Sequence, residues 1–105
     1  MKAMKVFVSV PRTHADAVRD AIGREGGGKI GNYSFCSFSV SGIGRFRPEK
    51  GAHPSIGSIG NIELVEEEKI EFVCRPEILN EVVEAIRKAH PYEEPAIDAF
   101  EVELF

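Results

Sequence analysis

Four stretches of the chain alternate apolar with polar residues at a period of two, a pattern typical of strands with one buried face. These stretches are residues 4–11, 33–40, 62–74 and 96–105. In the third stretch a charged step at residues 66–69 interrupts the alternation, which indicates a bulge or a bend. The chain is therefore expected to contain four strands.

The parity of the apolar residues gives each strand two distinct faces. The apolar residues that share one parity are Val6, Val8 and Val10 in the first strand, Cys36, Phe38 and Val40 in the second, Ile62, Leu64, Ile70, Phe72 and Cys74 in the third, and Ala96, Phe100, Val102 and Leu104 in the fourth. Ser37, Ser39 and Ser41 form the other face of the second strand, which suggests solvent or a close neighbouring backbone. Asp98 has the inward parity of the last strand, so we expect it near the sheet edge or beside a polar partner.

Two other stretches repeat apolar residues every three to four positions, as an amphipathic helix does. The first helix follows Pro11, with Thr13 as the expected N-cap, and it ends at the glycines 26–28. The second has Pro76 in its first turn and ends before Pro91. The apolar stripes are Ala15, Val18, Ala21 and Ile22 in the first helix, and Leu79, Val82, Val83 and Ile86 in the second.

The order of elements is therefore strand, helix, strand, strand, helix, strand. Two right-handed crossovers place both helices on one face of an antiparallel four-stranded sheet, which is the ferredoxin-like α+β sandwich. The other sheet face lacks helices, and Phe7, Val73, Ile97 and Phe105 are expected to make it apolar. Because an exposed apolar patch on a small domain normally marks an interaction surface, we expect a homo-oligomer.

Length and composition are those of one globular domain, residues 1–105, with 43% hydrophobic and 29% charged residues. No apolar run approaches the ~20 residues that cross a bilayer, and the N-terminus shows no signal-peptide pattern. Cys36 and Cys74 are too few and too far apart for a disulfide framework or a CxxC site. We therefore expect a cytoplasmic protein that does not bind a membrane.

Positive and negative charges are divided unevenly along the chain. Residues 1–60 carry nine Lys and Arg against four Asp and Glu, whereas residues 61–105 carry four against thirteen. One interpretation is that these side chains lie on solvated faces, and the other is that complementary faces help copies of the chain to assemble. The net charge of −4 argues against nucleic acid as a partner, because proteins that bind phosphate backbones carry a basic surface.

The least regular stretch is residues 42–60, which is rich in glycine and proline. A connection this long in a compact domain is usually functional or disordered, so we expect a small-molecule or protein partner here. One hypothesis is that Arg45 and Arg47, next to two glycines, hold a phosphate with guanidinium and backbone N–H groups. The alternative is a flexible hairpin tip that needs glycine for its turns.

The segment 90–98 contains an imidazole, a phenol, three carboxylates and two prolines. Four of its residues are candidate ligands of a divalent cation such as Zn, Ni, Cu or Mn: His90, Glu93, Glu94 and Asp98. Alternatively, His90 interacts favourably with the dipole at the C-terminus of the second helix, the glutamates are solvated and the prolines direct the chain into the last strand. An intermediate hypothesis has His90 and Glu93 facing the cleft of a neighbouring subunit.

No nucleophile and base can be paired from the sequence. Ser34, Cys36, Ser37 and Ser39 lack a neighbouring arrangement of histidine and acid, and His14 is interpreted as a surface residue. The glycines 26–28 follow a helix, whereas an anion site would place them before a helix N-terminus. These features predict no catalytic residues and favour a protein that is not an enzyme.

Two groups of residues resemble the insertion domain of the YqfO proteins, the Nif-three-like family with a dinuclear metal centre. The first group comprises Gly31–Phe38, Gly42–Pro48, Gly51–Pro54 and Ile56-Gly57, and the second is His90–Asp98. Several irregular glycine and proline positions match together, and the chain is similar from end to end to the stand-alone form of this domain. It departs from the family pattern at His53, where a small polar residue such as Asn is expected.

The resemblance implies a fold similar to PII signalling proteins and CutA, which are ferredoxin-like trimers. In PII proteins the loop between the second and third strands contacts partners, and nucleotides bind between subunits. Residues 42–60 would be the counterpart of that loop here. The metal centre of the full-length family lies in flanking domains, so its hydrolase activity is not implied for this sequence.

The leading hypothesis is a non-enzymatic, PII/CutA-like ligand-binding or regulatory module that forms a homo-oligomer, for example a trimer. Its candidate ligand-binding residues are Arg45, Arg47 and Tyr92. One alternative is a protein that binds a divalent metal ion through His90 and the carboxylates after it. The other is a metal-dependent hydrolase of the GTP cyclohydrolase type, which would need a metal with an open coordination position.

Overall fold

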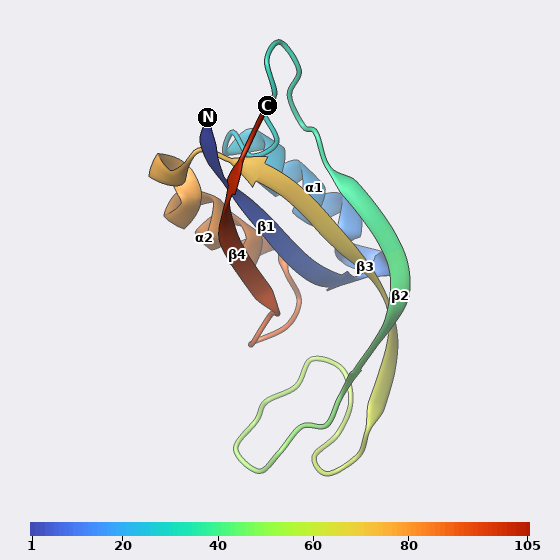
Figure 1. The fold of residues 1–105 in the computed structure, drawn as a ribbon. Coiled ribbons are helices and arrows are strands. Elements are labelled where there is room, and N and C mark those ends of the chain that lie inside the picture. Colours follow the sequence, from blue (N-terminus) through green and yellow to red (C-terminus); the bar gives the residue numbers. More distant parts are fainter.

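The computed structural model describes residues 1–105 and contains four strands and two α-helices (Figure 1). Their bounds are β1 Lys2–Pro11, α1 Ala15–Arg24, β2 Phe38–Phe46, β3 Glu63–Cys74, α2 Leu79–Ala89 and β4 Ile97–Glu103, with 3₁₀ turns η1 at Arg12–His14 and η2 at Pro76–Ile78. All strand pairs are antiparallel, in the order β2-β3-β1-β4. The predicted ferredoxin-like α+β fold is confirmed. Neither helix is long and apolar enough to cross a membrane.

The core lies between the sheet and the two helices, which cover the same sheet face (Figure 1). Its buried members come from β1, α1, β3 and α2: Val6, Val8, Val10, Ala15, Val18, Ile22, Ile70, Phe72, Cys74, Val82 and Ile86. Each belongs to an apolar face or stripe that the sequence predicts. Burial of this surface supplies the main favourable free energy of folding, at about 25 cal/mol per Å² of apolar area.

The two faces of β4 are the reverse of those predicted. β1 pairs Val8 with Ile97 and Phe7 with Asp98, and directly opposed residues of an antiparallel pair share a face. Ile97 therefore packs against the core under the helices, while Asp98 and Phe100 lie on the uncovered face. Both parities of β4 contain apolar residues, so the alternation alone gave the wrong face and the pairing with β1 decides it.

The uncovered sheet face is apolar, although not through all the residues predicted. Phe7 lies on it and stacks on Phe100, with 5.7 Å between the ring centroids. Val73 also lies on it, opposite Lys5 of β1, as predicted. Ile97 does not lie on this face, and Phe105 lies beyond the end of β4.

Strand β2 lies further along the chain than the alternation at residues 33–40 predicts. Its ladder with β3 is continuous from Phe38 to Phe46, so the glycines at 42 and 44 are part of a strand. Backbone pairing with a long neighbour overrides the weak strand propensity of glycine. The irregular connection predicted at residues 42–60 therefore occupies residues 47–62.

The charged step at residues 66–69 causes no bulge, because β3 keeps one register with both neighbours through it. The strand curves along its length (Figure 1). The side chains of this step find partners on alternate faces of the strand. On the helix side, Glu68 forms an ion pair with Arg19 of α1 at 2.7 Å, and the same guanidinium donates to Ser39 of β2. The serine face of β2 thus points toward a helix side chain.

Helix α1 begins differently from the prediction but ends as predicted. Because its first turn is the 3₁₀ turn η1, Thr13 lies inside that turn and no side chain caps α1, so the expected N-cap is wrong. Gly26 and Gly28 follow the helix with φ of 93° and 79°, the left-handed region that glycine adopts at helix ends. A Cβ at Gly28 would lie 2.3 Å from the carbonyl oxygen of Cys36, so that approach also requires glycine.

Strands β2 and β3 extend beyond the rest of the sheet as a two-stranded ribbon. β1 pairs with β3 only as far as Glu67, while residues 63–66 of β3 pair with residues 43–46 of β2 alone. The ribbon carries the connection 47–62 at the lower end of the molecule, which measures 46 × 23 × 21 Å (Figure 1). This arrangement leaves space beneath the ribbon, next to the segment that joins α2 to β4.

Candidate ligand pocket

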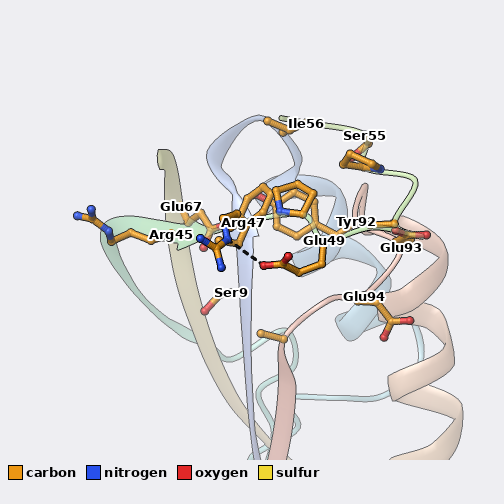
Figure 2. A pocket seen from close by; sticks show the side chains of 16 residues that line it. Ser9, Arg45, Arg47, Glu49, Ser55, Ile56, Glu67, Tyr92, Glu93 and Glu94 are labelled. Atoms are coloured by element: carbon orange, nitrogen blue, oxygen red, sulfur yellow. Dashed lines mark hydrogen bonds and ion pairs between the residues drawn. The ribbon is translucent and has the colours of Figure 1, made fainter. Parts of the chain in front are cut away.

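A pocket of about 410 Å³ lies between the ribbon, the first part of the connection 47–62 and the segment that leads into β4 (Figure 2). Its volume falls in the range of small-molecule sites in proteins. The side chains that line it are mostly those of the ribbon, the connection and the segment before β4: Arg45, Phe46, Arg47, Pro48, Glu49, Ala52, Pro54, Ser55, Ile56, Glu67, Tyr92, Glu93, Glu94 and Ala96. Ser9 and Gly44 complete the lining.

Tyr92 joins the two sides of this pocket. Its hydroxyl donates a hydrogen bond to Oε2 of Glu67 at 2.8 Å, and its ring meets the ring of Phe46 edge to face, with centroids 5.4 Å apart. Burial, and next the hydrogen bond to Glu67, raise the pKa of Tyr92 well above its ordinary value of 10.0. The phenol therefore stays protonated and acts as a donor.

Glu67 is the most buried acidic residue of the pocket, with 9% of its surface exposed. Its place in the ladder, opposite Gly42, puts it on the same face of the ribbon as Gly44. A Cβ at Gly44 would lie 2.1 Å from Oε1 of Glu67, so any larger residue there would have to displace this carboxylate. Sequence reasoning missed Glu67, because nothing in the local pattern separates it from the neighbouring Glu66 and Glu68.

His90 lies behind Tyr92 and is buried, with 7% exposed. Its Nε2–H donates to the carbonyl oxygen of Ser9 at 2.7 Å, and its Nδ1 accepts the backbone N–H of Tyr92 at 3.1 Å. These two partners fix the neutral tautomer with the proton on Nε2. Burial lowers the pKa of His90, and the hydrogen bond to Ser9 opposes this only in part. The ring thus positions Tyr92 from a neutral state.

The four predicted metal ligands do not converge in this structure. Both ring nitrogens of His90 are engaged by the backbone, and Glu93 accepts the backbone N–H of His53 at 2.7 Å. Asp98 lies on the uncovered face of β4, opposite Phe7, and Glu94 is exposed. No three His, Cys, Asp or Glu side chains lie close enough to hold an ion. The hypothesis of a metal site formed by these residues therefore gains no support from the geometry of one chain.

The predicted ligand-binding residues differ in their relation to the pocket. Tyr92 and Arg47 both line it, but the guanidinium of Arg47 is already paired with Glu49, Nε to Oε1 at 2.8 Å. Figure 2 shows Arg45 directed away from the other labelled side chains. Since the glycines at 42 and 44 belong to the β2 ladder, they do not form a loop that could cradle a phosphate.

The fold as a whole is that of the CutA proteins. The chain matches the periplasmic divalent cation tolerance protein CutA of Archaeoglobus fulgidus with a TM-score of 0.71 and 19% identity, over 100% of this chain and 87% of that one. CutA1 of Pyrococcus horikoshii gives a TM-score of 0.70 at 21% identity, over 97% and 85%. At these identities the likeness concerns the fold alone. No protein-family model matches the chain.

Closer sequence relatives are longer proteins. The chain is 53% identical over 96 residues to a protein of Halalkalibacterium halodurans and 46% identical over 99 residues to one of Bacillus subtilis, both named GTP cyclohydrolase 1 type 2 homolog. These matches cover 91% and 94% of this chain but only 26% of each relative. A solved Bacillus cereus protein related to NIF3 matches with a TM-score of 0.84 at 43% identity, over 98% of this chain and 26% of that one.

The chain is thus homologous to one segment, about a quarter in length, of the Nif-three-like (YqfO) proteins. This finding confirms the resemblance seen in the sequence.

Proposed function

We propose that this chain is a non-enzymatic ligand-binding or regulatory module that acts as a homo-oligomer and binds its ligand in the pocket lined by Phe46, Glu67 and Tyr92. The observation that carries the proposal is the pocket itself, whose wall holds a buried carboxylate and an aromatic pair. Sites for small molecules are typically concave and mostly apolar, with a few well-placed polar groups.

The chemistry of the pocket supports binding over catalysis. The ring of His90 contacts that of Tyr92, and both of its nitrogens are bound to backbone groups, so it is not free to act as a general base. Tyr92 is held as a hydrogen-bond donor to Glu67 rather than poised to lose its proton. Neither side chain is paired with a nucleophile, which is the arrangement that covalent or acid–base catalysis would need.

The uncovered sheet face supports the homo-oligomer. Phe38 and Val40 of β2 lie on the same face as Phe7 and Phe100, because the ladders through β3 and β1 place them there. Three of these side chains, Phe38, Val40 and Phe100, are more than half exposed in the single chain. A second copy that covers this face would remove an apolar patch from water.

A ligand screen combined with light scattering tests this proposal. We expect at least one class among nucleotides, amino acids, amines and organic acids to raise the melting temperature and to shift the amide resonances of Phe46 and Tyr92. We also expect a mass larger than that of one chain by light scattering. A ligand that stabilises the protein but shifts the resonances of other amides would show that the ligand binds outside this pocket. No stabilisation by any class would remove the binding function, and a monomer would remove the assembly.

A further inference from the structure

We propose that the pocket binds an organic cation, an ammonium or guanidinium group on a short apolar stem, with Glu67 as its counter-ion. This inference rests on the proposed binding function and names the class of ligand. Three observations support it: Glu67 has no counter-ion within the chain, aromatic side chains lie beside it, and the pocket carries more negative than positive charge.

The carboxylate of Glu67 lacks a counter-charge within the chain. It is nine-tenths buried, and it takes part in none of the ten ion pairs of the structure. One hydrogen bond, from the hydroxyl of Tyr92 to Oε2, is its only side-chain contact with a donor. A carboxylate offers about four lone-pair sites, and burial of its charge without a counter-ion is unfavourable. An ion in the pocket would supply the missing charge.

The two arginines that line the pocket, Arg45 and Arg47, do not supply that charge. Arg45 lies opposite Leu64, whereas Glu67 lies opposite Gly42, so the alternation of side chains puts Arg45 on the other face of the ribbon. Arg47 is already paired with Glu49. The site next to Glu67 is thus left to a group from outside the chain.

The walls beside Glu67 fit an organic cation better than a bare ion. Phe46 and Tyr92 present aromatic rings to the pocket, and a cation within about 6 Å of a ring face is attracted by its π-electrons. Pro48, Pro54 and Ile56 give the remaining wall an apolar surface that suits a hydrocarbon stem. A volume of about 410 Å³ has room for such a molecule.

The charges around the pocket also favour a cation. Four glutamates line it, against two arginines, Arg45 and Arg47, and the side chain of Arg45 is directed away from the others (Figure 2). The guanidinium of Arg47 is neutralised by Glu49. An anion such as a phosphate would meet more negative than positive charge here. The structure therefore favours a cation, whereas Arg45 and Arg47 in the sequence alone suggested an anion.

The test uses three unbranched probes of five carbon atoms each: n-pentylammonium, 1-pentanol and pentanoate, each titrated into the full chain and followed by amide NMR. We expect only n-pentylammonium to shift the resonances of Gly44, Phe46 and Tyr92 in a saturable way. Glu67→Gln, which keeps the shape and removes the charge, should weaken that binding at least about tenfold. Glu66→Gln, the same change on the other face of β3, is the matched control and should leave the affinity unchanged.

Each other result overturns the inference in a recognisable way. If pentanoate or a nucleotide binds at these amides and n-pentylammonium does not, the pocket binds anions and the proposed function survives without this inference. If n-pentylammonium binds equally well to Glu67→Gln, Glu67 is not the counter-ion. If no free probe binds but Glu67→Gln changes the mass by light scattering, a cationic side chain of a second copy occupies the pocket. If no compound of any class binds, the proposed function falls as well.

Discussion

The hydroxyl of Tyr92 donates to Oε2 of Glu67 over 2.8 Å, and this bond links the segment after α2 to the middle of β3. Nδ1 of His90 accepts the backbone N–H of Tyr92, and the ring of Phe46 packs edge to face against the ring of Tyr92. The pocket wall is therefore a set of contacts between residues from three separate parts of the chain, and each contact can be tested alone.

Tyr92→Phe should destabilise the protein, because it removes the one side-chain donor of a buried carboxylate while keeping the ring. We expect the free energy of unfolding in urea to fall by about 1–3 kcal/mol. Tyr33→Phe is the matched control, since Tyr33 is exposed. Equal stability of the two variants would mean that the bond to Glu67 contributes nothing.

Gly44→Ala should destabilise the protein, because the added Cβ would lie 2.1 Å from Oε1 of Glu67 and would push this carboxylate away from the hydroxyl of Tyr92. Gly42→Ala is the control in the same strand, where a Cβ meets nothing within 4 Å. Overpacking of this kind typically costs about 1–3 kcal/mol in unfolding experiments. Adding Glu67→Ala to Gly44→Ala should relieve the clash, and a double variant without any relief would place the strain elsewhere.

Stability should fall as the pH drops below about 6.5, the pKa of an unfolded histidine, because burial holds the pKa of His90 below that value in the folded state. Between the two pKa values the unfolded chain binds more protons than the folded one, so acid favours unfolding. His90→Gln should flatten this part of the profile, measured by urea unfolding from pH 5 to pH 8. His53→Gln, at an exposed position, should keep the profile of the original protein; an unchanged profile in His90→Gln would contradict this account.

Phe38→Asp should dissociate the proposed homo-oligomer, because it places a charge on the uncovered sheet face. Ile43→Asp is the matched control, since Ile43 lies in the same strand, on the opposite face, and is 60% exposed against 63% for Phe38. Light scattering should show a smaller mass for Phe38→Asp only. Dissociation by Ile43→Asp alone would assign the interface to the other side of β2.

Titration with Zn²⁺ decides the hypothesis of a metal site at His90, Glu93, Glu94 and Asp98. Because the ring nitrogens of His90 are both bound to the backbone, we expect no saturable heat that depends on these residues. The variants His90→Gln and Asp98→Asn should give the same calorimetric titration as the original protein. A stoichiometric site that both variants lose would establish the metal site and contradict the expectation.

Local periodicity in the sequence was sufficient to predict much of the fold. The alternation of Val6, Val8 and Val10 and the spacing of Val82 and Ile86 are short-range patterns, and they place the same residues in the core of the structure. The glycines after α1 and the proline before α2 mark helix ends by their own backbone preferences. These features could be predicted because each depends on residues within a few positions of one another.

The candidate site could be predicted only in part. Tyr92 stood out because it lies in a segment dense with polar groups and prolines. Its partner Glu67 is one of three consecutive glutamates, and only the pairing of β3 with β2 separates it from the other two. Arg45 and Arg47 looked suited to an anion, yet the ribbon turns Arg45 away and Glu49 pairs with Arg47.

The order of the elements, the apolar faces of β1 and of both helices, and the resemblance to the Nif-three-like proteins could all be derived from local patterns in the amino-acid sequence. Tertiary structure alone decided which face of β4 meets the helices, how far β2 continues past its glycines, and that Glu67 and Tyr92 share a pocket. The physical reason is the range of the interactions. Periodicity and turn preferences act between neighbours along the chain, whereas strand register and the burial of a carboxylate depend on contacts between distant segments.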